Sequence, residues 1–145
     1  MPQIQDSIDF IWASRGDIIF GDTGDVADTK FDPLRSLAQE TLTRVKSGVE
    51  DWDVFPGLGA DIADMVGQPN NKETAELIRT RIIASLARDG FINTRDMEVK
   101  YFPLNHESLF IRISIKVSPT ALNGNSNSLV LNTLYNYSDN NIYSV

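Results

Sequence analysis

Residues 70–117 decide the fold, because they hold the clearest helix and the clearest pair of strands in the chain. The segment KETAELIRTRIIASLARDG (72–90) predicts an amphipathic helix, since its apolar residues recur at helical spacing. Asn70 is the expected N-cap, with Glu73 three residues on in a capping-box pattern, and Gly90 supplies the stop. The apolar face of this helix is formed by Ala75, Leu77, Ile78, Ile82, Ile83 and Leu86.

After Gly90 the hydrophobic period changes from that of a helix to that of a strand. The segments MEVKYF (97–102) and LFIRISIKV (109–117) alternate apolar and polar residues, which predicts a half-buried antiparallel hairpin. A third alternating segment, 129–137, follows a long polar loop. We expect it to be the last strand of its sheet, with residues 138–145 as a loose polar tail that only a partner would order.

The first half of the chain predicts a hairpin and a second main helix. Strand-like residues 16–20 and 26–30 flank a turn of Gly and Asp, which is typical of a small hairpin. Asp32 and Pro33 open a helix over 33–47, and residues 60–66 suit a short helical stretch. The predicted fold class is α+β: a small antiparallel sheet packed on two main helices, with an N-terminal hairpin.

The chain divides into an N-terminal arm (1–15), a single domain (16–137) and a C-terminal tail (138–145). The arm carries Ile4, Ile8, Ile11 and Trp12 at helical spacing. It forms either a short helix or an extended arm that docks onto a neighbour. In both cases its apolar surface requires a partner, either the chain's own core or another chain.

Composition narrows the function classes. The 145 residues suit one domain, and a formal net charge of −7 repels phosphate backbones, so nucleic acid is not an expected partner. No apolar run approaches the ~18 residues of a membrane helix, and no signal peptide is visible. The chain lacks Cys, which excludes thiolate chemistry and fits a reducing cytoplasm. With one His, no metal site and no cofactor are expected.

Acidic residues near the end of the first helix permit a catalytic hypothesis. A glycosidase needs two carboxyl groups a few ångströms apart beside an apolar wall. Glu40, Glu50 and Asp53 lie close in sequence, and Trp52 could desolvate one of them. The loop over 48–59 also carries large apolar groups, which we expect to be buried: Trp52, Val54, Phe55 and Leu58. Acidic residues after a helix are far more often a solvated loop, and His106 is an exposed turn residue by the same reasoning. The sequence therefore predicts no enzyme.

Four residues are candidates for partner binding: Arg95, Trp12, Tyr135 and Tyr137. Arg95 lies at the corner between helix and sheet, where it either makes a bidentate contact with a carboxylate or is an ordinary surface residue. Tyr135 and Tyr137 lie on the predicted last strand, and tyrosine is favoured at protein interfaces. Trp12 belongs to the apolar arm.

The order of five segments resembles a family of small baseplate wedge proteins of contractile phage tails. The segments are GDIIFGDTGD, SLAQETLTRVKSGVEDW, FPGLGADIADMVGQP, ELIRTRIIASLARDGFINTRDMEV and LFIRISIKV, within residues 16–117. The family is the sheath-initiator, or lysozyme-like baseplate, family, which is related to a type VI secretion baseplate component. Many members carry Glu-Pro-Arg directly after the second long helix. The corresponding place here reads Asn93-Thr94-Arg95, so that Arg95 matches.

The resemblance implies a structural subunit of the virion tail baseplate, assembled in the host cytoplasm. It would contact other wedge proteins and the tail sheath protein, initiate the sheath, and occur in multiple copies in a symmetric assembly. Two alternatives remain open at this stage. One is a muramidase-like cell-wall hydrolase that uses acids among Glu40, Glu50 and Asp53, and the other is a small stand-alone binding adaptor.

Overall fold

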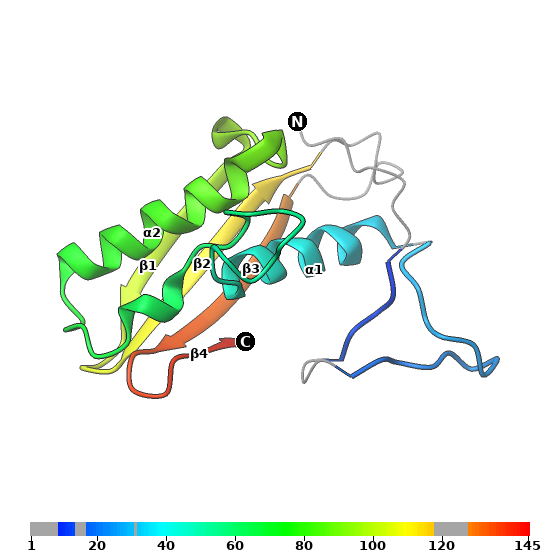
Figure 1. Ribbon diagram of the computed structural model, residues 1–145, viewed down its shortest axis with the longest axis horizontal. Coiled ribbons are helices and arrows are strands. Elements are labelled where there is room, and N and C mark those ends of the chain that lie inside the picture. The colour runs from blue at the N-terminus through cyan, green and yellow to red at the C-terminus, as the bar shows by residue number, and fades with distance from the viewer. Residues whose placement is uncertain (1–8, 14–16, 31, 118–127) are drawn as a thin grey trace.

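A computed structural model describes residues 9–13, 17–30, 32–117 and 128–145. Over these residues the chain forms two helices and a four-stranded antiparallel sheet of strand order β1-β2-β3-β4, packed against α2 (Figure 1). The α+β prediction is confirmed. The elements in chain order are α1 (Pro33–Lys46), η1 (Ile62–Met65), α2 (Lys72–Ala87), η2 (Arg88–Gly90), η3 (Thr94–Asp96), β1 (Met97–Pro103), β2 (Ser108–Lys116), β3 (Ser128–Asn136) and β4 (Asn141–Ser144).

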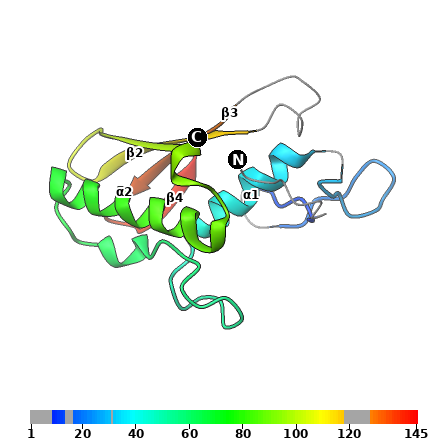
Figure 2. The ribbon, with the colours of Figure 1, turned by 90° about the horizontal axis from the view of Figure 1, so that it is seen from above.

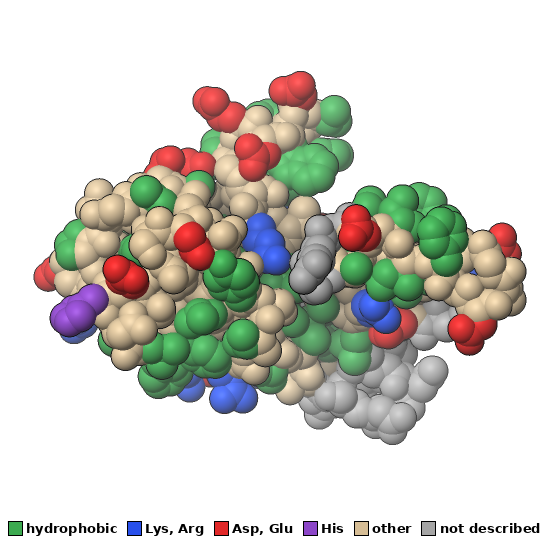
Figure 3. All heavy atoms as spheres, turned by 90° about the horizontal axis from the view of Figure 1, so that it is seen from below, with side chains coloured by type: hydrophobic (Ala, Val, Ile, Leu, Met, Phe, Trp, Pro, Cys, Tyr) green, Lys and Arg blue, Asp and Glu red, His purple; other side chains and the backbone are tan. Residues whose placement is uncertain are grey.

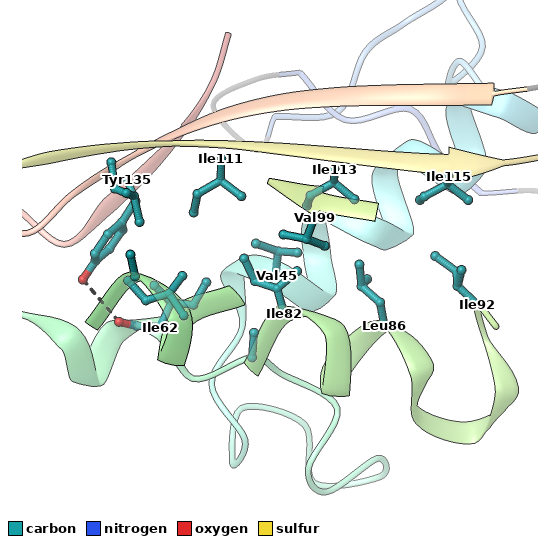
Figure 4. Packing of buried hydrophobic residues seen from close by; sticks show 14 of the residues in the cluster. Val45, Ile62, Ile82, Leu86, Ile92, Val99, Ile111, Ile113, Ile115 and Tyr135 are labelled. Carbon is teal, nitrogen blue, oxygen red and sulfur yellow. Dashed lines mark hydrogen bonds between the residues drawn. The ribbon is translucent and has the colours of Figure 1, made fainter. Parts of the chain in front are cut away.

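The core lies between α2 and the sheet. The period-2 pattern of β2 turns one set of its side chains toward the helix, and the helical period of α2 turns its apolar face back toward them. Figure 4 shows Ile82 and Leu86 of α2 facing Ile113 and Ile115 of β2, and all four are fully buried. Val45 brings α1 into the same cluster.

The N-cap of α2 differs from the prediction by one residue. Asn71 is the cap, because its side-chain oxygen accepts from the Thr74 backbone N–H at 2.8 Å. Asn70 instead donates its side-chain N–H₂ to the carbonyls of Asn105 (2.6 Å) and Ser108 (3.1 Å). The predicted cap therefore joins the start of the helix to the β1–β2 turn.

The start of α1 matches the prediction, and its end is tied to the loop that follows. Asp32 caps the helix by accepting from the Arg35 backbone N–H at 3.1 Å. At the other end, the backbone N–H of Ala60 donates to the Arg44 carbonyl at 3.0 Å. The helical stretch predicted over 60–66 is only the 3₁₀ turn η1, because Asp61 before it adopts a positive φ of 57°.

The tail prediction was wrong, because the last residues complete the sheet. Asn140 adopts a positive φ, which Asn tolerates, and its N–H donates to the Asn136 carbonyl at 3.1 Å. The chain thus reverses, and β4 pairs with β3 in antiparallel register. β3 is consequently an interior strand, and the sheet edges are β1 and β4.

The N-terminal hairpin is present, and a third segment joins it. Phe20 pairs with Val26, and the Gly21 N–H donates to the Asp25 carbonyl at 2.7 Å. Residues 9–13 run alongside, with the Ile11 N–H donating to the Ala27 carbonyl at 2.9 Å. We call residues 9–13 and 17–30 the hairpin lobe, which projects from the body beside the start of α1 (Figures 1 and 2).

The described part of the predicted arm is therefore extended, and the helical alternative does not hold for residues 9–13. Ile4, Ile8 and Arg15 lie outside the described residues.

Candidate interaction surfaces

The hairpin lobe carries large apolar side chains on its outside. Among its described residues, only Ile11 and Thr29 are buried. On the right of Figure 3, hydrophobic side chains gather on this lobe. Exposed apolar groups that cluster in this way mark a contact site in a soluble protein. We call the cluster the lobe patch: Phe10 (57 % exposed), Trp12 (49 %), Ile18 (46 %) and Phe20 (67 %).

Polar contacts with α1 hold the hairpin lobe in place. The Gln39 side chain accepts from the Trp12 backbone N–H and donates to the Phe10 carbonyl, both at 3.0 Å. The Ser36 hydroxyl donates to the Asp9 carboxylate at 2.6 Å. These contacts use backbone and polar atoms, so the lobe is fixed while the aromatic side chains of Phe10 and Trp12 stay exposed. Gln39 carries no sequence signal for this role, since a polar residue on a helix surface is ordinary.

A second exposed surface is the acidic loop, residues 48–59. Trp52 and Phe55 are exposed there among three carboxylates, which corrects the expectation that its large apolar groups are buried. The base of the loop is closed by backbone contacts, with the Gly57 N–H donating to the Val49 carbonyl at 2.7 Å. Trp52 also donates its indole N–H to the Ser47 hydroxyl at 3.1 Å. The loop is thus a fixed projection with an aromatic and acidic tip.

The glycines of the acidic loop serve close packing. A Cβ on Gly59 would overlap the backbone carbonyls of Ser47 and Gly48, so the loop approaches the end of α1 more closely than any side chain allows. Gly57 has a positive φ of 81° and lies under the Arg88 guanidinium. Both glycines are explained by the contact of this loop with the two helices.

The acids considered for catalysis are not gathered around one cavity. Glu40 accepts from Arg44 Nη2 at 3.0 Å, while Glu50 and Asp53 are exposed on the acidic loop. A pocket of about 550 Å³ lies between this loop and α2, and none of the three acids lines it. The described residues contain no group of three His, Asp or Glu side chains that could hold a metal ion. No helix among them is long and apolar enough to cross a membrane.

Arg44 is a structural residue that sequence reasoning missed. Its guanidinium lies 4.1 Å from the centre of the Phe91 ring, a cation–π contact. It also donates to the carbonyls of Ser85 and Arg88 at 3.4 Å, near the C-terminal end of α2, where a positive charge is favoured. The signal was its position beside Val45 on the buried face of α1.

Two predicted partner-binding residues are exposed and two are buried. Trp12 lies in the lobe patch, and Arg95 lies in η3, where its backbone N–H donates to the Asn93 side chain at 3.0 Å. The partner-binding role of Trp12 and Arg95 stays a prediction. Tyr135 lies on the helix side of β3, and Tyr137 directly follows that strand. Both belong to the core, so the surface role inferred for them is corrected.

The two tyrosines differ in how their hydroxyl groups are satisfied. The rings meet edge to face with their centres 4.9 Å apart. Tyr135 donates to the Ile62 carbonyl at 3.2 Å, which is the dashed line in Figure 4. The Tyr137 hydroxyl has no hydrogen-bond partner among the described residues. Burial, with a further contribution from Tyr135, raises the pKa of the Tyr137 phenol to about 12.

Comparisons of the chain with known protein families, with curated proteins and with solved structures found no match. The lobe patch, the acidic loop and the Arg95 corner therefore have to be interpreted from their own geometry. All three are projections or corners of the body, which favours contact with large partners over enclosure of a small molecule.

Proposed function

We propose that this chain is a structural subunit of a contractile phage tail baseplate wedge, which assembles with other wedge proteins and initiates the tail sheath. The observation that supports it best is the lobe patch, an exposed and mainly aromatic surface on a lobe that Gln39 fixes to α1. The resemblance in the order of segments within residues 16–117 supports this class of assembly. An enzyme would need a lined cavity for its reacting groups, whereas a subunit needs surfaces of this kind.

The size of the lobe patch suits a subunit with several neighbours. Covering four side chains that are each about half exposed removes apolar area worth roughly 4 kcal/mol in total. Association costs at least that much in lost translational and rotational freedom. The lobe patch alone therefore gives a weak contact. In a symmetric assembly, several such contacts on one subunit act together and hold it firmly.

The acidic loop and the Arg95 corner are the candidates for the additional contacts. The loop presents Trp52 beside negatively charged carboxylates, whereas Arg95 presents a positively charged side chain. Charged groups at the rim of an interface set register and exclude wrong partners more than they add affinity. Each neighbour would thus be recognised by a surface of different charge.

Particle incorporation tests the proposal. A Phe10→Ser/Phe20→Ser variant should enter assembled tails at least tenfold less than the wild type, by quantitative mass spectrometry of purified particles. The control is Leu77→Ser, which changes another large exposed apolar residue, on α2 (45 % exposed), and should incorporate normally. Equal incorporation of the double variant, or absence of the wild-type chain from tail particles, would contradict the proposal.

The hydrolase alternative is tested separately with the purified chain on cell-wall substrate. We expect no hydrolysis, because Glu40 is engaged by Arg44 and the loop acids are exposed. Hydrolysis by the wild type that Glu50→Gln abolishes would overturn the structural role. A stand-alone adaptor would instead show one oligomeric state of fixed size at all concentrations in sedimentation measurements.

A further inference from the structure

The sheet has an apolar row on the face turned away from α2. Antiparallel partners share a face of the sheet, so the register places one residue of each strand in line: Phe102, Phe110, Leu134 and Tyr143. Phe102 and Tyr143, at the two ends, are 50 % and 44 % exposed, and the two central residues are half-buried. With strands about 4.8 Å apart, the row is roughly 14 Å long. We call it the sheet row.

Positive charge lies beside the sheet row. The next line of outward residues, roughly 7 Å along the strands, contains Lys100 opposite Arg112, and Lys116 lies further along β2. Glu98 is the carboxylate on the outward side of β1, and it pairs with Lys100 at 3.1 Å. Within the described part of the chain, no carboxylate forms a salt bridge with Arg112. At the other end of the sheet row, the Asp139 carboxylate accepts from the Tyr143 hydroxyl at 2.7 Å. The positive charge of this face therefore lies on its β1–β2 side.

The hairpin lobe has the complementary character. Its described residues contain five aspartates against one lysine, and Asp28 is paired with Phe10 on the face of the lobe patch. The aspartates are Asp9, Asp17, Asp22, Asp25 and Asp28, and the lysine is Lys30. The lobe is therefore aromatic and acidic, whereas the β1–β2 side of the outer sheet face is aromatic and basic.

The two surfaces lie toward opposite ends of the longest axis of the molecule. The β1–β2 turn, next to the sheet row, is at one end of Figure 1, and the hairpin lobe is at the other. Gln39 and Ser36 fix the lobe on α1. The lobe consequently does not reach the sheet row of its own chain, and the complementary surface must come from another molecule.

We infer that the outer face of the sheet binds the hairpin lobe of a second copy of this chain, in a head-to-tail contact. The inference rests on the proposed function and deepens it, since it names one neighbour in the assembly. Such a contact is heterologous and leaves one lobe and one sheet face unused at the two ends. Further copies can then be added, which gives either a closed ring or a row. Because oppositely charged groups meet, salt weakens the contact.

A mixing experiment tests the contact directly. The sheet-face variant is Phe110→Ser/Arg112→Glu, and the lobe variant is Phe20→Ser/Asp25→Lys. Sedimentation should show concentration-dependent association of the wild type that weakens as salt rises from about 50 mM to about 500 mM. Each variant alone should associate at least tenfold more weakly. Their mixture should form a 1:1 dimer and stop, because only one intact lobe and one intact sheet face remain.

The matched control is Leu77→Ser/Lys72→Glu, which makes the same kinds of change on the exposed side of α2 and should associate like the wild type. Thermal melts check that every variant is folded. A wild type that stays monomeric, a mixture that does not form dimers, or one variant that self-associates normally would overturn the inference. Particle incorporation is measured separately, so failure here is distinguishable from failure of the proposed function.

Discussion

The body and the hairpin lobe use large apolar residues in opposite ways. In the body, Ile82 and Ile113 are fully buried between helix and sheet. In the lobe, Phe10 and Phe20 are more than half exposed, and isolated backbone pairs and the contacts with Gln39 maintain the structure. The body therefore owes its stability to its apolar residues. The lobe is held by polar contacts, which leaves its apolar residues for a partner.

The largest expected difference between the two regions comes from truncating one apolar side chain in each. Ile113→Ala should lower the free energy of unfolding by about 3–4 kcal/mol, because it leaves a cavity in the core. Phe20→Ala should change it by no more than about 0.5 kcal/mol, since that side chain is 67 % exposed. Urea unfolding measures both. A large loss of stability in Phe20→Ala would break the comparison.

A glycine in each region gives the next largest effect. Gly59→Ala should destabilise the body by about 3 kcal/mol, because the new Cβ meets backbone atoms that cannot rotate away. Gly24→Ala in the lobe meets no atom within 4 Å and costs only about 1 kcal/mol for its φ of 86°. Thermal melts of the two variants compare them directly. Equal destabilisation would show that the acidic loop is less tightly packed than its geometry indicates.

The smallest effect distinguishes two tyrosines within the body. Tyr137→Phe should stabilise the protein by about 1 kcal/mol, because it removes a buried hydroxyl without a partner among the described residues. Tyr135→Phe should destabilise it by about 1 kcal/mol through loss of the bonds to Ile62 and Asn140. Chemical denaturation at neutral pH measures both changes. If both variants shift stability in the same direction, the assignment of the two hydroxyl groups is wrong.

Tyr137 also predicts a loss of stability at alkaline pH. The pKa of Tyr137 is raised from 10.0 to about 12 by burial, so the unfolded chain loses this proton first. The free energy of unfolding should therefore fall as the pH rises from 10 to about 12. Below pH 10 the phenol is protonated in both states, so it adds no pH dependence there. Tyr137→Phe should make this decline shallower. An unchanged slope in the variant would show that the phenol of Tyr137 ionises normally in the folded protein.

The elements predicted best are those with the longest regular patterns. The helix and the two strands within residues 70–117 were found within a few residues because their periods of 3.6 and 2 persist over many positions. The N-cap residue of α2 was predicted one position too early. Asn70 and Asn71 are chemically identical, so only their surroundings decide which one caps the helix.

The elements that could not be predicted depend on contacts distant in sequence. β4 was missed because its four residues include only Ile142 and Tyr143 as apolar groups, and pairing with β3 is what makes it a strand. That pairing makes β3 an interior strand, and the register turns Tyr135 to the core side of the sheet, in line with Leu109 and Ile142. The acidic loop was expected to bury its aromatic groups, but a backbone contact at Gly59 fixes it as a projection.

The candidate surfaces were predicted only in part. Trp12 was selected for its apolar surroundings in sequence, and it does lie in the lobe patch. Phe20 and Ile18 were assigned to a strand without a surface role, because alternation alone does not say which face of a hairpin is covered. The sheet row could not be found before the register was known, since it joins one residue from each of four strands.

The meander order of the sheet also bears on how the chain folds during synthesis. Every strand pairs with its neighbour in sequence, so β1 to β4 and the preceding α2 form through short loop closures, which fold fast. α1 leaves the ribosome before any of these elements, with Leu37 and Val45 still uncovered. Its docking must wait for the second half of the chain. We expect the order of synthesis to be opposite to the order of folding, with the hairpin lobe positioned last.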